Sequence, residues 1–234
     1  MKLNLKSKKY FYSKFQACDN STACFFFILE NAIFKNLFKK KVPKLSMKKY
    51  LIVGLGNVGE EYNNTRHNIG FKIIDRLVEK NETDWEVKKL AYYSSFKKKG
   101  RQFLLIKPST FMNNSGKAVR YWALKEKIPL QNILIITDDL HLPFGDLRLR
   151  PKGSPAGHNG LKDVENQLNT SNYPRLRFGI GQNYKTFDQV KFVLDQWDET
   201  EKTKIEERVS ICTEAIVCFC LEGINSAMNK FNGK

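Results

Sequence analysis

The sequence predicts an α/β fold, a single three-layer α/β/α domain whose twisted sheet is mixed but mostly parallel. From residue 47 onward, short apolar stretches rich in β-branched residues alternate with segments whose apolar residues recur at helical spacing. Strands that alternate with helices are typical of a sheet covered by helices on both faces. A chain of 234 residues is long enough to bury one such core.

Six strands are expected, and a basic turn containing Gly100 joins two of them into a hairpin. They span residues 49–54, 91–96, 102–106, 132–137, 147–150 and 175–180. The strand at 147–150 is short and is expected at an edge of the sheet. Helices are expected from residue 69, from 115 to about 127, at 160–168, and from 199 to about 228 as one long closing helix. Ser115 is the expected cap of the second helix, and the pattern leaves 190–194 unassigned.

The first 46 residues need a separate account. They hold ten Lys, no Arg and two acidic residues, a net of +8. Their apolar run at 23–29 is far shorter than the about 20 residues that span a bilayer, and no small-residue cleavage site follows it. We expect Met47 to be the natural start, residues 1–46 to be a disordered or artefactual basic extension, and 47–234 to be the α/β domain. The alternative is a basic tail that adds affinity for RNA.

The charge of the chain is its most unusual bulk property. Apolar residues at 41% and charged residues at 27% are ordinary for a globular protein, but the net charge is +16. Such a surplus raises the local concentration of polyanions, so nucleic acid or an acidic surface is a plausible partner. A solvated basic face without a ligand is the alternative.

The five Cys residues include no CxxC pair, and three of them fall in the apolar pattern of the last predicted helix. There Cys behaves as a small hydrophobic residue. The pattern indicates a reducing compartment, no disulfide framework and no zinc site.

A polar stretch at 57–68 follows the first strand and is too long to be a mere connection. Its twelve residues include four Asn, one Arg and His67. His can take and return a proton near neutral pH, so we expect proton-transfer chemistry at His67. In open α/β sheets, sites lie beyond the carboxyl ends of the strands. His67, Asn113 and Asp138 all follow predicted strands, although a lone loop His or Asn is more often a cap or turn residue.

One motif in this region points elsewhere. Residues 54–59 match GxGxxG after a strand, as in dinucleotide-binding folds. In those folds the helix begins within the glycine loop, and its N-terminus meets the pyrophosphate. Here a polar segment separates the glycines from the helix, and the acidic residues Asp75 and Glu79 lie inside that helix. An NAD or FAD site is therefore disfavoured, and the glycines are expected to form a tight turn that exposes Asn57.

Four segments together resemble the signature blocks of the bacterial peptidyl-tRNA hydrolase family. They are LIVGLGNVGEEYNNTRHNIGF at 51–71, KPSTFMNNSG at 107–116, TDDLHLPFG at 137–145 and AGHNGLKD at 156–163. RLRFGIG at 175–181 is similar too, and the resemblance covers 47 to about 230. Any one block would be weak evidence, but four in the family's order and spacing are specific.

The resemblance implies a metal-independent esterase without a cofactor that releases peptide and tRNA from peptidyl-tRNA. His67 matches the catalytic base that activates water, and Asp138 matches the carboxylate that orients it. Asn113 matches a residue near the water and the ester carbonyl, and Asn159 one that binds the peptide and helps to place water. Asn57 matches one that faces the end of the tRNA. These are expectations carried by the resemblance.

Further binding residues follow from the same resemblance. Phe111 and Met112 match the apolar wall of the peptide groove, and His158 belongs to the GHN motif. Tyr62 is expected to stack on the tRNA terminus. Arg150 and Arg177 match a clamp for the 5′-phosphate of the acceptor stem, although a solvated Arg is the alternative for each.

Three positions depart from the family pattern. Val58 stands where Pro is usual, which would loosen the Asn57 turn. His141 stands where many members have Asp, which would place a second imidazole near Asp138. The residues at 154–156 replace a glycine-richer run, which would stiffen the loop before the GHN motif.

The partner implied by the resemblance is peptidyl-tRNA, bound through its acceptor stem and 3′ end. We expect a cytoplasmic monomer without a membrane partner, which cleaves N-blocked aminoacyl-tRNA and spares free aminoacyl-tRNA. The alternative is a non-enzymatic RNA-binding protein on the same fold, similar to organellar splicing factors that resemble this family. Retention of His67 and Asp138 argues against that alternative.

Overall fold

β1 (Lys48–Gly54) lies at the centre of a seven-stranded sheet in the order β2-β3-β4-β1-β5-β7-β6. The computed structural model describes residues 47–181 and 188–233, so the predicted extension at 1–46 lies outside the described residues. The other strands are β2 (Glu86–Lys88), β3 (Ala91–Lys98), β4 (Arg101–Pro108), β5 (Ile133–Asp139), β6 (Leu147–Arg150) and β7 (Arg175–Gly179). β4, β1, β5 and β7 run parallel, whereas β3 and β6 run antiparallel to their neighbours. The mixed, mostly parallel sheet is as predicted.

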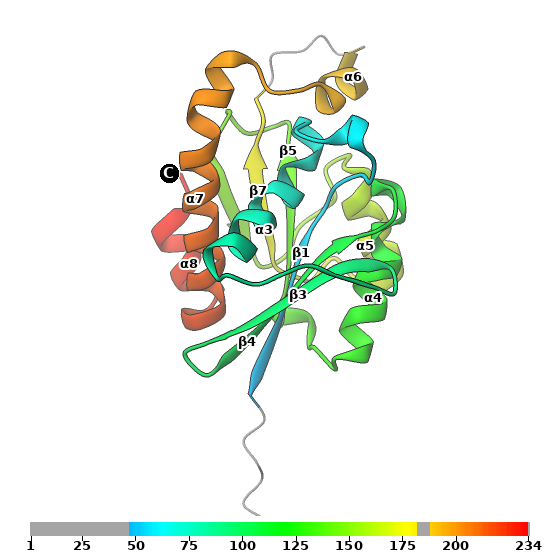
Figure 1. The fold of residues 1–234 in the computed structure, drawn as a ribbon, viewed down its shortest axis with the longest axis vertical. Coiled ribbons are helices and arrows are strands. Elements are labelled where there is room, and N and C mark those ends of the chain that lie inside the picture. The colour runs from blue at the N-terminus through cyan, green and yellow to red at the C-terminus, as the bar shows by residue number, and fades with distance from the viewer. Residues whose placement is uncertain (1–46, 182–187, 234) are drawn as a thin grey trace, which may run out of the picture. The chain divides into compact units, whose positions relative to one another are not determined.

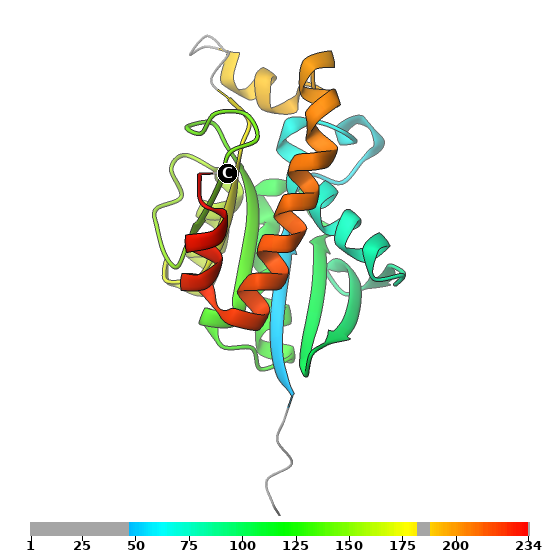
Figure 2. The same ribbon diagram turned by 90° about the vertical axis from the view of Figure 1, so that its left-hand side faces the viewer.

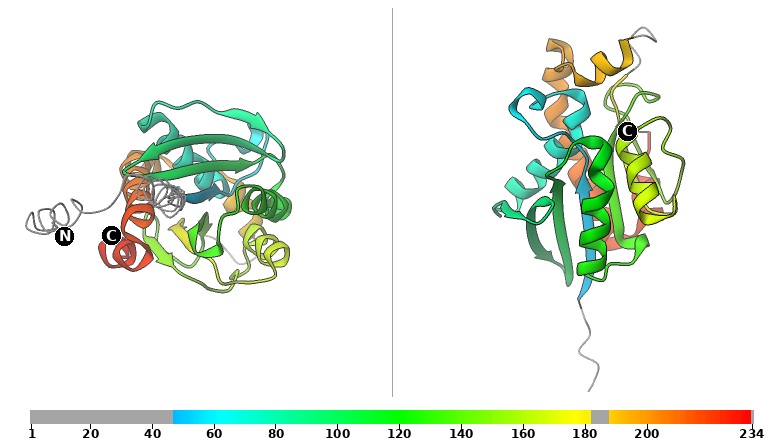
Figure 3. Two further views of the ribbon diagram at one scale, coloured as in Figure 1. Left: turned by 90° about the horizontal axis from the view of Figure 1, so that it is seen from below. Right: turned by 90° about the vertical axis from the view of Figure 1, so that its right-hand side faces the viewer.

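Helices cover both faces of this sheet and complete the predicted three layers (Figure 1). α3 (Ile69–Lys80), α7 (Glu199–Glu222) and α8 (Ile224–Phe231) lie on one face, which Figure 2 shows. α4 (Ser115–Lys125) and α5 (Asn159–Leu168) lie side by side on the other face (Figure 3). The short helix α6 (Gln189–Leu194) lies beyond one end of the sheet, beside the start of α7 (Figure 1).

The side chains of β1 divide between two cores. Tyr50 and Ile52 pack with the cluster beneath α3 and α7, whereas Leu51 and Val53 pack with the cluster beneath α4 and α5. Successive side chains of a strand point to opposite faces, so a strand covered on both sides must be apolar at every position. Each such side chain contributes about 1.5–3 kcal/mol by its burial. The parallel strands therefore form a rigid platform for the loops at their carboxyl ends.

Several predicted elements are corrected by the structure. Gly223 has φ +98° and separates α7 from α8, where a single helix was predicted. Ser115 is the first residue of α4, and its hydroxyl donates to the carbonyl oxygen of Met112 over 2.9 Å, so it does not cap that helix. The three-residue strand β2 was not predicted, and residues 190–194 belong to helix α6.

Three of the five cysteines lie in the described part of the chain. Cys212, Cys218 and Cys220 are buried and free, as expected for small apolar residues on α7. Cys18 and Cys24 lie outside the described residues. Among residues 47–181 and 188–233, no helix has the length and apolar character needed to cross a bilayer.

Candidate active site

A pocket of about 290 Å³ opens beyond the carboxyl ends of β1, β4 and β5. β1 lies between β4 and β5 and runs parallel to both, so the loops that follow the three strands meet at one edge of the sheet. The pocket brings together eight residues predicted from the sequence: Asn57, His67, Met112, Asn113, Asp138, His158, Asn159 and Arg177. Several come from segments more than forty residues apart.

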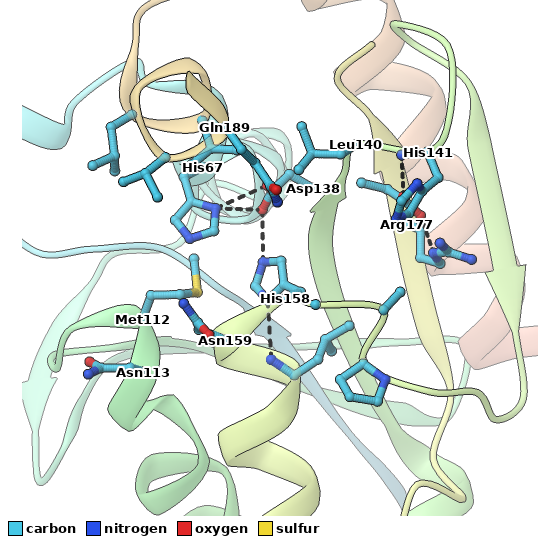
Figure 4. A pocket seen from close by; sticks show the side chains of 18 of the residues that line it. His67, Met112, Asn113, Asp138, Leu140, His141, His158, Asn159, Arg177 and Gln189 are labelled. Atoms are coloured by element: carbon cyan, nitrogen blue, oxygen red, sulfur yellow. Dashed lines mark hydrogen bonds and ion pairs between the residues drawn. The ribbon is translucent and has the colours of Figure 1, made fainter. Parts of the chain in front are cut away.

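Asp138 lies at the centre of the pocket and contacts two imidazoles (Figure 4). His67 Nδ1 lies 3.0 Å from both carboxylate oxygens, and His158 Nε2 lies 2.9 Å from Oδ1. The two rings are 5.0 Å apart between centroids. Only 3% of the Asp138 side chain is exposed, against 13% of His67. The carboxylate is thus shielded from water, whereas His67 borders the pocket.

The hydrogen bonds of His158 fix the proton on its ring. His158 is the N-cap of α5, and its Nδ1 accepts the backbone N–H of Leu161 over 3.2 Å. A neutral imidazole that accepts at one nitrogen carries its proton on the other, so Nε2–H donates to Asp138. His67 binds Asp138 through Nδ1, which leaves its Nε2 lone pair directed away from the carboxylate. His67 is therefore the imidazole that can accept a proton from water.

The same contacts shift the pKa values of the pair in opposite directions. Burial alone would lower the pKa of His67, but the charge of Asp138 and the hydrogen bond to it outweigh this and raise that pKa. Burial alone would raise the pKa of Asp138. The charge of His67 and the hydrogen bonds from His67 and His158 instead hold the pKa of that carboxyl well below its usual range. Asp138 is thus ionised at neutral pH and stabilises a proton on His67.

Asn57 connects the loop after β1 to the loop after β4. Its side-chain oxygen accepts the backbone N–H of Met112 over 2.7 Å, and its backbone exchanges two hydrogen bonds, of 2.8 and 2.9 Å, with the side chain of Asn68. These bonds hold the turn at Val58, where the missing Pro was expected to loosen it. The amide nitrogen of Asn57 is the side-chain donor that remains for a substrate. Asn68 follows His67 directly, so the same bonds hold the base.

The other two predicted amides are presented at the pocket surface. Asn113 lies in the short 3₁₀ turn Met112–Asn114 and is exposed. Asn159 is the first residue of α5 and is exposed too, while the capping role falls to His158. Met112 is buried between them and lies close to Gly160, where a Cβ would come within 2.6 Å of its sulfur. The close approach of α5 to this turn therefore depends on a glycine at that position.

Three predicted residues do not line the pocket. Tyr62 and Phe111 lie edge to face with ring centroids 6.4 Å apart, and 54% of Phe111 is exposed. Arg150 is exposed at the end of β6, where it pairs with Arg175 in the strand register. Arg177 does line the pocket, but its guanidinium forms an ion pair with the buried Asp139.

His141 was expected to place a second imidazole near Asp138, and the two residues line the same pocket (Figure 4). The second imidazole that contacts Asp138 is that of His158, whereas His141 donates its backbone N–H to Asp139 over 2.8 Å. Sequence reasoning missed the α6 wall of the pocket, which is formed by Gln189, Val190, Val193 and Leu194. Its short apolar run had been left unassigned, and its distance along the chain gave no signal of this position.

His67, Asp138 and His158 are the one group in the described part of the chain whose donor atoms are spaced to hold a metal ion. Their proton arrangement does not suit that role. A metal-bound His normally donates its other ring N–H to a neighbour, but the other nitrogen of His158 accepts a hydrogen bond. A metal at Nε2 would therefore require loss of the α5 cap. The arrangement suits proton transfer.

Comparisons with known proteins agree with this geometry. The family model described as peptidyl-tRNA hydrolase matches residues 51–234. A peptidyl-tRNA hydrolase of Bacteroides fragilis is 53% identical over 186 residues, which is 80% of this chain and 100% of that protein. The one from Phocaeicola vulgatus is 51% identical with the same coverage. The crystal structure of peptidyl-tRNA hydrolase from Acinetobacter baumannii superposes with a TM-score of 0.75 at 30% identity, over 80% of this chain and 96% of that one. The chain belongs to the peptidyl-tRNA hydrolase family and acts as a hydrolase on the ester bond of peptidyl-tRNA.

Proposed function

We propose that His67 is the general base for this hydrolysis and that Asp138 orients it. The observation that carries the proposal is the 3.0 Å contact between His67 Nδ1 and Asp138, which leaves Nε2 available at the pocket. A base held in this way is suited to a water nucleophile. Metal and cofactor chemistry is not part of the proposed reaction.

In the proposed reaction, Nε2 of His67 takes a proton from a water molecule as its oxygen attacks the carbonyl carbon of the ester. The carbonyl π electrons move to oxygen and form a tetrahedral oxyanion. Asp138 stabilises the imidazolium that results, because its buried carboxylate stays ionised. When the oxyanion collapses, the bond to the ribose oxygen breaks, and His67 returns the proton to that oxygen. The products are tRNA and a peptide carboxylic acid, which releases its proton to water and becomes a carboxylate.

Amide donors in the pocket are proposed to position the substrate. Asn113 donates to the developing oxyanion, and the free amide nitrogen of Asn57 faces the tRNA end of the ester. Asn159 binds the peptide backbone, and Met112 forms the apolar floor beneath it. All four line the pocket with His67. Neutral amides can stabilise developing charge without altering the charge balance of the His67–Asp138 pair.

The tRNA is proposed to bind through its acceptor stem and 3′ end. The edge-to-face pair of Tyr62 and Phe111 offers an exposed aromatic surface for an unpaired base. Arg150 and Arg177 lie on the same face of the antiparallel pair β6 and β7, where alternate residues point the same way. We propose that they bind a terminal phosphate and that the protein acts as a cytoplasmic monomer.

The domain at 47–234 is proposed to carry the whole activity. The family match covers residues 51–234, and the match to the Bacteroides fragilis relative spans 186 residues and the whole of that protein. Residues 1–46 would then be dispensable for hydrolysis. Equal activity of the full chain and of residues 47–234 is expected, and a loss on removal would show that the extension contributes.

The decisive assay is release of tRNA from N-acetylated aminoacyl-tRNA by the full chain. Loss of a general base costs on the order of a hundredfold or more, so His67→Ala should lose at least that. The matched control is His141→Ala, because His141 lines the pocket without contacting Asp138, and it should keep most of the activity. Free aminoacyl-tRNA should be spared. Equal losses in the two variants would remove His67 from its role, and RNA binding without cleavage by the parent would favour the RNA-binding alternative.

A further inference from the structure

Arg66, the residue directly before His67, is buried and connects the catalytic turn to the C-terminal part of the chain. It begins the 3₁₀ turn Arg66–Asn68, and only 7% of its side chain is exposed. Its guanidinium lies over the ring of Phe192 at 4.4 Å and near that of Trp197 at 5.6 Å. A buried guanidinium must be hydrogen-bonded to be tolerated, so its partners identify the segments that it connects.

The partners of Arg66 belong to two neighbouring segments. Its Nη2 lies 2.6 Å from Glu201 Oε2, and its Nη1 donates to the carbonyl oxygen of Gln196 over 2.8 Å and to that of Phe192 over 3.4 Å. Its backbone N–H donates to the carbonyl oxygen of Asp195 over 3.1 Å. A planar guanidinium can satisfy several acceptors at fixed angles, which an ammonium cannot. One side chain thus holds the end of α6 and the start of α7.

Glu201 is itself fixed by the first turn of α7. Its carboxylate accepts the backbone N–H of Asp198 over 2.9 Å, while the Asp198 side chain accepts the backbone N–H of Glu201 over 2.8 Å. This reciprocal pair is a capping box. Arg66 therefore binds a carboxylate whose position is fixed by the first turn of α7. This makes the connection between the His67 turn and α7 rigid.

α6 forms a wall of the pocket although none of its residues is buried. It packs against the turn that carries His67. Val190, Val193 and Leu194 line the pocket, and 71% of Val190 is exposed. An apolar surface of this kind over a hydrolytic pocket gains stability when a peptide side chain covers it.

We propose that Arg66 is a positioning residue that fixes the α6 wall relative to His67, so that contact between α6 and the peptide of the substrate is coupled to placement of the base. The inference rests on the proposed function of the pocket. It assigns Arg66 no contact with the reacting atoms. Arg66 sets the position of the α6 wall, and the peptide of the substrate packs against this wall. The position of the peptide in turn places the ester beside Nε2 of His67.

The test compares two substrates, N-acetylated aminoacyl-tRNA and a tRNA that carries an N-acetylated apolar tripeptide. The parent should have the higher kcat/KM on the longer peptide. Arg66→Lys keeps a positive partner for Glu201 but loses the planar guanidinium that binds several acceptors at once. A small misplacement of reacting groups lowers the rate by up to about a hundredfold. It should lose about tenfold or more on the tripeptide substrate, mostly through KM, and much less on the short one.

Two further variants separate positioning from stability. Lys72→Ala removes a partly exposed ion pair of 2.8 Å that links α3 to Glu206 of α7. This link to α7 does not involve the turn at Arg66 or helix α6. It should leave both kcat/KM values unchanged. Val190→Ser alters the exposed surface of α6 without touching Arg66, so it should reduce the preference for the tripeptide while Tm stays the same.

The possible failures are distinguishable. A parent inactive on both substrates would overturn the hydrolase function and this inference with it. An active parent that does not prefer the longer peptide, or an Arg66→Lys variant that lowers Tm yet keeps the parent's ratio of the two kcat/KM values, would overturn the inference alone. Equal losses on both substrates would also overturn it, because the coupling to the peptide would be absent.

Discussion

His158 donates its Nε2–H to Oδ1 of Asp138 over 2.9 Å. The other nitrogen of this ring caps α5, so His158 has no lone pair left for a substrate proton. His67 contacts the same carboxylate through Nδ1 alone. The two imidazoles on one carboxylate therefore differ in their contacts, and only His67 has a ring nitrogen left for the proton exchange proposed above.

Replacement of His158 by Asn should change the pH dependence of activity. Asn is a good N-cap, so α5 is kept, but its shorter side chain leaves Asp138 with one donor fewer. The carboxylate then holds a proton on His67 more strongly, which raises the pKa of His67. The acid limb of kcat/KM should move to higher pH, and the folded state should lose about 1.5–3 kcal/mol, as for a hydrogen bond to a charged group. An acid limb at the parent's pH would argue that His158 does not tune His67.

Activity and stability should respond to pH in opposite directions at His67. Neutral His67 is needed to accept a proton, so kcat/KM should rise as pH passes through its folded-state pKa, which lies above the ordinary 6.5. The same raised pKa stabilises the folded protein fully below the unfolded-state pKa, and this contribution is lost as pH rises through the folded-state pKa. The lowered pKa of Asp138 gives a contribution that is present above the ordinary carboxyl pKa and lost as pH falls through the folded-state value.

Urea unfolding from about pH 5 to about pH 9, beside the kcat/KM profile, measures both effects. His67→Gln is the control, because it keeps an amide near Asp138 and cannot titrate. The decline in stability with rising pH should be shallower in this variant. Parallel stability curves for parent and variant would contradict the raised pKa.

Asn57→Asp should separate the two roles of this side chain. A carboxylate can still accept the backbone N–H of Met112, which now bonds to Asn57 Oδ1 over 2.7 Å, but it has no N–H to donate. Loss of one preorganised donor costs about a hundredfold to a thousandfold in rate, so kcat should fall while Tm stays near that of the parent. Asn57→Ala, which removes the acceptor too, should lower Tm as well. A parent-like rate in Asn57→Asp would leave Asn57 with its structural role alone.

Arg150 and Arg177 should differ although both are proposed to bind phosphate. Arg150 is exposed, so Arg150→Ala should change stability by less than about 0.5 kcal/mol and reduce the salt slope of tRNA binding by about one. Arg177→Ala also strands the carboxylate of Asp139, whose side chain is 4% exposed. Because Arg177 is partly open to water, the loss should be about 2–3 kcal/mol, below the about 3–5 kcal/mol of a fully buried pair. Lys202→Ala on α7 serves as the surface control for binding.

The backbone of the loop before His158 is strained at residue 156, and substitutions can test this strain. Ala156 has φ +49° and Gly157 has φ +84°, both in the left-handed region. This conformation costs a non-glycine residue about 1–2 kcal/mol, partly offset because Gly has more freedom in the unfolded chain. Ala156→Gly should therefore stabilise the protein by up to about 1 kcal/mol in urea unfolding. Gly157→Ala should destabilise it by about 1 kcal/mol, for conformational reasons alone, because a Cβ there would meet no atom within 4 Å.

The local elements were predictable where one physical signal dominated. The central residues of β1 and β5, at 51–53 and 133–136, are apolar without a break because helices cover both faces of the sheet. α3 shows one apolar face toward the core. The prediction failed where two local signals competed. Ser115 looked like an N-cap, but its hydroxyl bonds backward to Met112. Gly223 lay inside an apolar pattern that continued past it, and its positive φ ended the helix.

The sequence by itself determined the fold class and the family, and its motifs named the residues now proposed to be catalytic, because these depend on periodicity and on motifs that are local in the chain. Only the tertiary structure decided which hydrogen bonds each of those residues makes and which of their polar atoms remain free for a substrate. The proton on His158 depends on a helix that begins beside it, and the donor of Asn57 is free only because its oxygen is held by Met112. The link between Arg66 and the α6 wall joins residues 126 positions apart, and the link between Arg66 and α7 joins residues 135 positions apart. Hydrogen bonds between distant segments leave no periodic pattern, so a single sequence does not reveal them.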